Sequence, residues 1–251
     1  MEISLSGRTA VITGASRGLG EAMAKALSGA GAQIALVARD RDRMESVRSD
    51  IAASQQTAEV FVADVTQEDQ VARLAEEIKG RFGSPQILIN NAGINVRKNL
   101  ADFTLDEFRS VLDASLISTF LMCRAFAPGM QGTGYGRILN MTSIMSHVSL
   151  PGRAAYSSAK AALLGLTRAL SLELAADGIT VNGISPGPIG TDMNLQLMNN
   201  PEIRAQFLAN IPVGRWGRVE EIGALACYLC SESAGFITGT DILIDGGWTT
   251  R

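Results

Sequence analysis

Short runs of β-branched and apolar residues alternate with amphipathic stretches along the whole chain. The short runs have the length and composition of buried strands, and the stretches between them have the apolar spacing of helices. The expected strands are residues 8–13, 33–38, 59–63, 86–89, 136–142, 179–184 and 241–244. The expected helices are residues 21–30, 40–53, 67–81, 104–128, 154–176 and 219–230. Such alternation requires a parallel sheet with right-handed crossovers and helices on both faces.

The pattern predicts one α/β domain over residues 1–251, a doubly wound, Rossmann-type fold with a parallel sheet of about seven strands. The length suits one large domain with a well-buried core, and no linker or low-complexity segment divides it. Residues 190–212 are polar and rich in methionine and follow neither a clear strand pattern nor a strong helix pattern. We therefore expect this segment to be a mobile substrate lid.

Composition narrows the classes of partner. The formal net charge of −3 does not favour nucleic acid or an anionic membrane. Residues 1–7 lack a basic region followed by an apolar core, and no uninterrupted apolar run approaches the length that spans a bilayer. These features predict a cytoplasmic protein.

The three cysteines are an odd number, which argues against a disulfide framework. Cys227 and Cys230 form a lone Cys-x-x-Cys inside the expected helix 219–230, and the single histidine, His147, is far away in the sequence. A zinc ion requires four ligands. We therefore predict no metal site and expect these thiols to pack as small hydrophobic groups.

A glycine-rich turn, Thr13-Gly-Ala-Ser-Arg-Gly-Leu-Gly20, lies between the first expected strand and the first expected helix. Ligands of doubly wound sheets bind beyond the carboxyl ends of the strands. Glycines there let the backbone approach a pyrophosphate, and the helix dipole favours an anion. The spacing is Gly-x-x-x-Gly-x-Gly, and by itself it fits either a nucleotide site or a tight turn.

Tyr156 and Lys160 are four residues apart at the start of the expected helix 154–176, so their side chains share one face. An ammonium beside a phenol stabilises the phenolate and lowers the phenol pKa. Ser143 follows the expected strand 136–142, whose tip could bring a hydroxyl to the same place. The three groups would suit proton transfer to or from a carbonyl oxygen. Because Tyr-x-x-x-Lys also occurs by chance, this interpretation needs the second signal that the glycine-rich turn gives.

Together, five motifs resemble the ordered motif set of the short-chain dehydrogenase/reductase family, single-domain branch. They are Thr13 to Gly20, Asn90-Asn91-Ala92-Gly93, Ser143, Tyr156 with Lys160, and Pro186-Gly187. The resemblance covers essentially the entire chain. It implies an oxidoreductase in which Ser143 donates a hydrogen bond to the substrate carbonyl and Tyr156 delivers the proton. By the same resemblance, Lys160 binds the nicotinamide ribose and lowers the tyrosine pKa.

One position departs from the family pattern. Family members usually carry an asparagine in the long helix before the serine strand, where it helps to hold a water that relays protons from the lysine. The matching residue here is Ser115, which offers one hydroxyl in place of an amide. With a main-chain carbonyl as a second anchor it can still hold the water, so an intact relay, slower catalysis and lost catalysis all remain open.

The resemblance also implies a set of cofactor contacts. Asp64 and Val65 would contact the adenine, Asn91 and Gly93 the adenosine ribose, and Ile189 and Thr191 the nicotinamide carboxamide. The full expected set is Gly14, Ser16, Arg17, Gly18, Leu19, Gly20, Arg39, Asp64, Val65, Asn91, Gly93, Tyr156, Lys160, Ile189 and Thr191.

The charge at the end of the second strand predicts which nicotinamide cofactor is bound. Enzymes that select NAD usually place a carboxylate there, which binds the ribose 2′-hydroxyl and repels a 2′-phosphate. Here the strand ends at Ala38-Arg39, with no carboxylate before Asp40. Arg39 and Arg17 could clamp the extra phosphate, so we predict NADP(H) over NAD(H). The alternative is that Arg39 is a surface charge or stacks on the adenine of NAD.

The substrate is less constrained. The chain looks most like 3-oxoacyl-carrier-protein reductases and gluconate-type sugar-acid dehydrogenases, and the sequence does not decide between them. For Arg97, Lys98 and Arg153 the simpler explanation is a solvated surface charge. For His147 it is packing of the loop. In each case the alternative is a contact with the substrate.

The resemblance further suggests a homotetramer formed through the long helices. The competing hypothesis for the function is a non-catalytic nucleotide-binding module that acts as a redox sensor or structural partner.

Overall fold

The computed structural model describes residues 3–191, 194 and 198–250. A single parallel sheet of seven strands runs through the molecule in the order β3-β2-β1-β4-β5-β6-β7. The strands are β1 Thr9–Thr13, β2 Gln33–Ala38, β3 Ala58–Val62, β4 Ile87–Asn90, β5 Gly136–Met141, β6 Ile179–Pro186 and β7 Asp241–Ile244. The predicted doubly wound α/β fold is confirmed, and the strand order reverses between β1 and β4.

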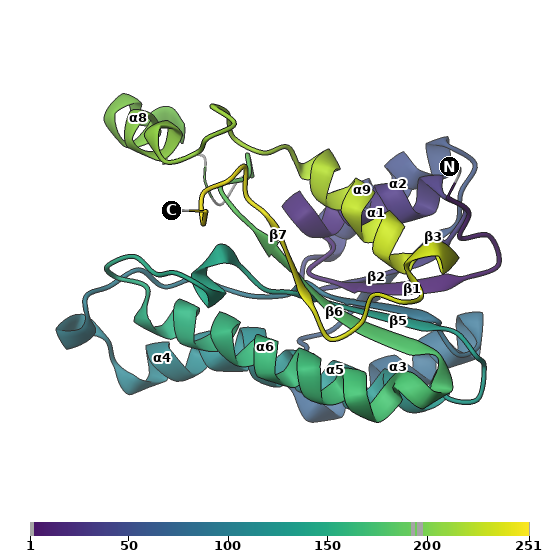
Figure 1. The fold of residues 1–251 in the computed structure, drawn as a ribbon. Coiled ribbons are helices and arrows are strands. Elements are labelled where there is room, and N and C mark those ends of the chain that lie inside the picture. The colour runs from purple at the N-terminus through teal and green to yellow at the C-terminus, as the bar shows by residue number, and fades with distance from the viewer. Residues whose placement is uncertain (1–2, 192–193, 195–197, 251) are drawn as a thin grey trace.

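Helices cover both faces of the sheet (Figure 1). Helices α1 (Gly18–Gly29), α2 (Arg41–Ala53) and α9 (Val219–Cys230) lie on one face. The opposite face carries α3 (Glu68–Phe82), α4 (Leu105–Leu112), α5 (Ser118–Phe126) and α6 (Ala154–Leu174). Most of these helices bury an apolar stripe against the sheet, whereas α4 packs its buried Val111 against Ala155 and Ala159 of α6.

Two apolar cores result, one on each side of the sheet. Every residue of β1, β4, β5 and β6 is buried, because strands covered on both faces contact helices on both sides. Cys227 and Cys230 lie in one core and Cys123 in the other. Burial raises the pKa of Cys227 to about 11 and of Cys123 to about 12. The thiols pack as small apolar groups, as the sequence predicted.

The expected helix 104–128 is a composite of three parts. Thr104 and Glu107 form the capping box that starts α4, a π-helical turn follows at Asp113–Ile117, and α5 completes the helix. The stretch Leu105–Gly129 is long and apolar enough to cross a membrane by length and composition, but half of it is buried inside the fold. It lies in the layer of helices below the sheet in Figure 1.

The segment predicted to be a lid contains a helix that the sequence analysis did not anticipate. Helix α8 (Pro201–Ala209) begins at Asn200, whose side chain accepts hydrogen bonds from two backbone N–H groups of the first turn. Phe207 on α8 packs between Trp216 and Trp248, with ring centres 5.3 Å apart in both pairs. Residues 192–193 and 195–197 of the predicted lid lie outside the described residues.

Candidate functional site

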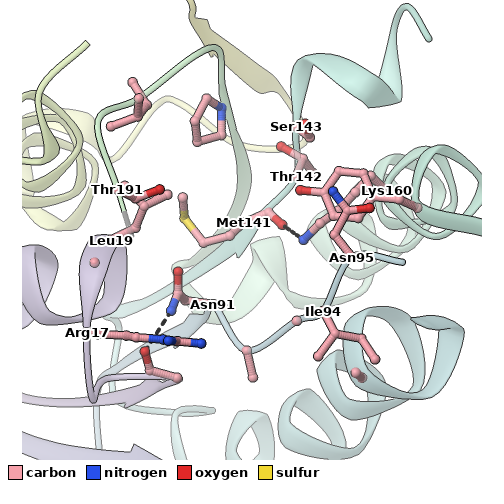
Figure 2. A pocket seen from close by; sticks show the side chains of 18 of the residues that line it. Arg17, Leu19, Asn91, Ile94, Asn95, Met141, Thr142, Ser143, Lys160 and Thr191 are labelled. Atoms are coloured by element: carbon pink, nitrogen blue, oxygen red, sulfur yellow. Dashed lines mark hydrogen bonds between the residues drawn. The ribbon is translucent and has the colours of Figure 1, made fainter. Parts of the chain in front are cut away.

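A cavity of about 930 Å³ opens at the carboxyl ends of the strands, beside the point where the strand order reverses. Figure 2 shows Arg17, Leu19 and Thr191 on one side of it and Ser143, Asn95 and Lys160 on the other. Phe207 and Trp248 also line the cavity, so α8 forms part of its wall. This is the position at which doubly wound folds bind their ligands.

The glycine-rich turn forms one end of the cavity. Gly14 and Gly18 have φ values of +63° and +59°, which only glycine adopts without strain. A Cβ atom added to Gly20 would lie 2.2 Å from the Gly14 carbonyl oxygen, so the turn can close against α1 only with glycine there. No side chain among the described residues caps the start of α1. Its first backbone N–H groups are therefore free to bind an anionic group such as a phosphate.

Asn91 stabilises this turn from the neighbouring strand end. Its side-chain amide donates hydrogen bonds to the carbonyl oxygens of Thr13 (3.0 Å) and Gly14 (3.1 Å). Its backbone N–H donates to Thr13 Oγ1 at 2.9 Å. Asn91 thus connects the tips of β1 and β4 while also lining the cavity.

Cationic side chains surround the outer part of the same end. Arg17, Arg39 and Arg43 all line the cavity. The guanidinium of Arg39 is largely exposed and lies 3.9 Å from the Asp64 carboxylate. Asp40 caps α2 by accepting the backbone N–H of Arg43, which holds this carboxylate at the helix terminus. The charge surplus at this end suits an anionic ligand.

The three residues predicted to be catalytic meet at the other end of the cavity. Ser143 follows β5, Tyr156 and Lys160 lie on the first two turns of α6, and all three line the cavity. Ser143 Oγ accepts a hydrogen bond from the Met145 backbone N–H at 3.1 Å, so its own hydroxyl proton can be donated to Tyr156 or to a ligand. The Lys160 ammonium donates to the Met141 carbonyl oxygen at 2.5 Å (Figure 2).

Burial dominates the protonation behaviour of this end. It raises the pKa of Tyr156, while hydrogen bonding from Ser143 and the charges of Arg153 and Arg97 act in the opposite direction. It also lowers the pKa of Lys160 to about 8. The expectation that the neighbouring ammonium leaves Tyr156 with a lowered pKa is therefore wrong for this structure, because desolvation outweighs the nearby cations.

Ser115 lies behind the cavity wall, in the π-helical turn between α4 and α5. Its Oγ is buried and has no hydrogen-bond partner among the described residues. A Cβ atom added to Gly93 would lie 3.2 Å from Ser115 Oγ and 3.8 Å from Lys160 Nζ, so both groups face the space beside Gly93. Buried hydroxyl groups of this kind are usually satisfied by an ordered water. The hydroxyl is therefore in a position to share a water with Lys160.

His147 faces away from this cavity. Its Nε2 lies 2.6 Å from the Asp241 carboxylate, which also accepts hydrogen bonds from Thr142 Oγ1 (2.5 Å) and Ser185 Oγ (2.6 Å). These contacts tie β7 to the ends of β5 and β6. A packing role for the histidine, the simpler of the two explanations, agrees with this geometry.

All but two of the predicted site residues line the same cavity. The two exceptions lie next to residues that line it, Gly20 beside Gly14 and Ser115 beside Gly93. The sequence analysis did not single out Arg43, Asn95 or Met141, which line it too. Arg43 could have been found from its place in the first turn of the helix that follows β2. Asn95 and Met141 each lie close to a motif that was recognised, but nothing in their residue types points to the site.

Comparisons with known proteins agree with this geometry. A family model described as enoyl-(acyl carrier protein) reductase matches residues 14–249. The chain is 35% identical to gluconate 5-dehydrogenase of Gluconobacter oxydans, covering 98% of this chain and 96% of that protein. It is 37% identical to a 3-oxoacyl-[acyl-carrier-protein] reductase of Pseudomonas aeruginosa, covering 98% of each.

Among solved structures, one similar fold is that of a gluconate 5-dehydrogenase from Burkholderia cenocepacia in complex with NADP and tartrate. The TM-score is 0.95 at 32% identity, and the alignment covers 100% of this chain and 98% of that one.

Proposed function

The chain belongs to the short-chain dehydrogenase/reductase family, and from this premise we propose that it is an NADP(H)-dependent oxidoreductase that interconverts a ketone and a secondary alcohol. The observation that carries the proposal is that Ser143, Tyr156 and Lys160 share one cavity with the glycine-rich turn at the start of α1. A proton donor thereby faces an anion-binding helix terminus across a space large enough for a dinucleotide and a small substrate.

Tyr156 is the proposed general acid in reduction and the general base in oxidation. Because burial raises its pKa, the phenol holds its proton near neutral pH and can give it to a carbonyl oxygen. Ser143, whose oxygen already accepts the Met145 N–H, donates a hydrogen bond to the same carbonyl oxygen and orients it. The bound nicotinamide supplies the hydride in reduction and accepts it in oxidation.

Lys160 and Ser115 are proposed to resupply the proton that Tyr156 gives away. A lysine whose pKa is about 8 can both hold and release a proton near neutral pH. The unpaired hydroxyl of Ser115 would anchor the water between Lys160 and the outside. If Ser115 serves as well as the usual asparagine, Ser115→Asn leaves kcat unchanged; a rise in kcat would show that the serine limits the relay.

NADP(H) is the proposed cofactor. Arg17 and Arg39 would hold the 2′-phosphate, and the N–H groups at the start of α1 would hold the pyrophosphate. The relative crystallised with NADP supports this choice.

The ratio of kcat/KM for NADPH and NADH tests this choice. We expect a preference for NADPH that Arg39→Ala reduces about tenfold or more, with little change for NADH. Arg41→Ala is the matched control, because Arg41 pairs with Glu45 on α2 and does not line the cavity. A preference for NADH in the unaltered protein would contradict the clamp.

Consumption of NADPH against a panel of ketones tests the oxidoreductase proposal itself. The panel includes keto derivatives of sugar acids, 3-oxoacyl thioesters and neutral ketoses. We expect turnover of at least one class. Tight binding of NADPH without oxidation by any of them would favour a non-catalytic sensor.

We also propose a homotetramer in the cytoplasm. Ile117, Phe120 and Leu172 are exposed apolar side chains on the helices of one face, which would support association through those helices.

A further inference from the structure

Two arginines at the reactive end of the cavity carry charge that no carboxylate of the described residues balances. Arg97 lies after β4 and Arg153 immediately precedes α6, and both line the cavity with Tyr156. Within residues 3–191, 194 and 198–250, neither forms an ion pair. Lys98, by contrast, lies 2.5 Å from the Glu107 carboxylate, so its charge is compensated.

The two arginines are held close to each other by the backbone. Gly152 has a φ of +76°, and a Cβ atom added to it would lie 3.6 Å from the Lys98 carbonyl oxygen. The two segments that carry the arginines are therefore in contact. Burial lowers the pKa of Arg153, and the charge of Arg97 lowers it further. Arg153 is half-buried and Arg97 is exposed. Placing a second positive charge beside the half-buried guanidinium costs free energy unless an anion joins them.

An unsatisfied acceptor lies at the same end of the cavity. Asn95 Oδ1 is buried and has no hydrogen-bond partner among the described residues. In Figure 2 the Asn95 side chain is on the same side of the cavity as Ser143 and Lys160. A buried acceptor without a partner destabilises the folded protein, and a hydrogen bond from a hydroxyl donor would remove that cost. Asp113 also lines the cavity, and it forms no ion pair with either arginine in the described part of the chain.

We propose that Arg97 and Arg153 form a subsite for a carboxylate of the substrate, and that Asn95 accepts a hydrogen bond from a substrate hydroxyl. This assignment rests on the proposed oxidoreductase function and names its substrate class, a hydroxylated keto acid and the corresponding hydroxy acid. Guanidinium groups bind carboxylates with charge-assisted, often bidentate hydrogen bonds. An apolar 3-oxoacyl chain offers neither a carboxylate nor a hydroxyl beside its carbonyl group.

The subsite is coupled to the proton donor. Arg97 and Arg153 are two of the groups that lower the pKa of Tyr156. A bound carboxylate neutralises their charge, so binding of the acid raises the phenol pKa and keeps Tyr156 protonated. Occupation of the subsite therefore leaves Tyr156 protonated, as burial already does, and makes the phenol a weaker acid.

Calorimetric binding of D-gluconate and D-glucitol to the NADPH-saturated protein tests the subsite. The two probes have the same hydroxylated chain, but gluconate ends in a carboxylate where glucitol has a CH₂OH group. Neither can be oxidised while the cofactor is in its reduced form. We expect gluconate to bind at least about tenfold more tightly than glucitol. Arg97→Gln and Arg153→Gln should each weaken gluconate binding by about tenfold to a hundredfold and leave glucitol binding unchanged.

Lys98→Gln is the matched control, since it removes one positive charge from the same loop and should change the Kd for gluconate less than about threefold. Three results would overturn the subsite. The protein could bind the two probes with equal affinity, it could show no detectable gluconate binding, or its affinity for gluconate could be unchanged in both arginine variants. The outcome is separable from that of the proposed function. Gluconate binding through the two arginines with no turnover of any ketone would refute the oxidoreductase alone, whereas turnover of ketoses and keto acids alike would refute the subsite alone.

Discussion

At the reactive end of the cavity, burial moves the pKa of Tyr156 and of Lys160 in opposite directions. For each group the uncharged form is favoured, because taking a charge out of water is costly. The phenol therefore keeps its proton, and the pKa of the lysine is brought closer to neutral pH. Because the Lys160 pKa now lies well below that of the phenol, transfer of a proton from Lys160 to a Tyr156 phenolate, through hydroxyl groups and water, is more favourable than between the same groups free in water.

The lowered pKa of Lys160 predicts a pH-dependent stability. Below pH 8 the side chain is charged in both states, and the folded state bears the full cost of burying that charge. Above about pH 10.5 it is neutral in both states and the cost disappears, so the free energy of unfolding rises with pH between these values. Between pH 7 and pH 9.5 this contribution amounts to about 2 kcal/mol. Lys160→Met removes it.

Urea unfolding of the wild type and Lys160→Met at the two pH values measures this effect. The stability of the wild type relative to the variant should rise by the stated amount. Lys25→Met is the control: Lys25 is a surface lysine with a raised pKa, so its substitution should have the same effect at both pH values. A wild-type-to-variant difference for Lys160 that does not change with pH would contradict the assignment.

Among the secondary-structure elements, α1 depends on its own first turn. Gly20 lies so close to the Gly14 carbonyl oxygen that a methyl group cannot enter without moving the turn. Gly29, at the other end of the same helix, has open space around it. The same substitution therefore has opposite consequences at the two ends.

Gly20→Ala is expected to destabilise the protein by about 1–3 kcal/mol and to weaken NADPH binding, because the displaced turn no longer fits a pyrophosphate. Gly29→Ala is expected to be neutral or to stabilise by up to about 1 kcal/mol. Thermal unfolding and fluorescence titration with NADPH check both variants. Unweakened NADPH binding by Gly20→Ala would show that the turn does not carry the cofactor.

The strands were predicted to within about two residues at their ends because each is an apolar run bounded by polar or glycine residues. Helix α9 and strand β7 were predicted with their observed bounds. The π-helical turn at Asp113–Ile117 was not predicted, since no residue pattern distinguishes it from α-helix. Helix α8 was missed because its apolar residues do not lie on one face, although Asn200-Pro201 is a recognisable helix start.

For the whole molecule, the sequence predicted the fold and those parts of the cavity wall that short motifs at strand ends supply. It did not predict the parts that come from elsewhere in the chain, such as Phe207 of α8 and Trp248. It did not predict the direction of the Tyr156 pKa, which depends on how deeply the assembled chain buries the phenol. It also did not show that Lys98 is paired while Arg97 and Arg153 form no ion pair with any other described residue, since such pairing depends on where Glu107 lies in three dimensions.

The exposed apolar residues on the helices of one face predict association. Leu172 on α6 is 83% exposed, and Ile117 and Phe120 are exposed on the same layer of helices. Apolar surface of this kind favours contact with another chain where it forms a contiguous patch. Leu172→Arg should lower the molar mass in solution below that of four chains. Val62→Arg, at the end of β3, should leave it unchanged. Multi-angle light scattering measures both, and a monomeric wild type would contradict the proposed homotetramer.

The account depends most directly on the proton that Tyr156 gives to the substrate. Tyr156→Phe removes one oxygen from a half-buried ring and leaves the glycine-rich turn and Lys160 in place. Turnover of the best ketone with NADPH should fall at least about a thousandfold, while the Kd for NADPH changes less than about threefold. A variant that binds NADPH normally and retains a substantial fraction of wild-type turnover would contradict the assignment of Tyr156 as the proton donor.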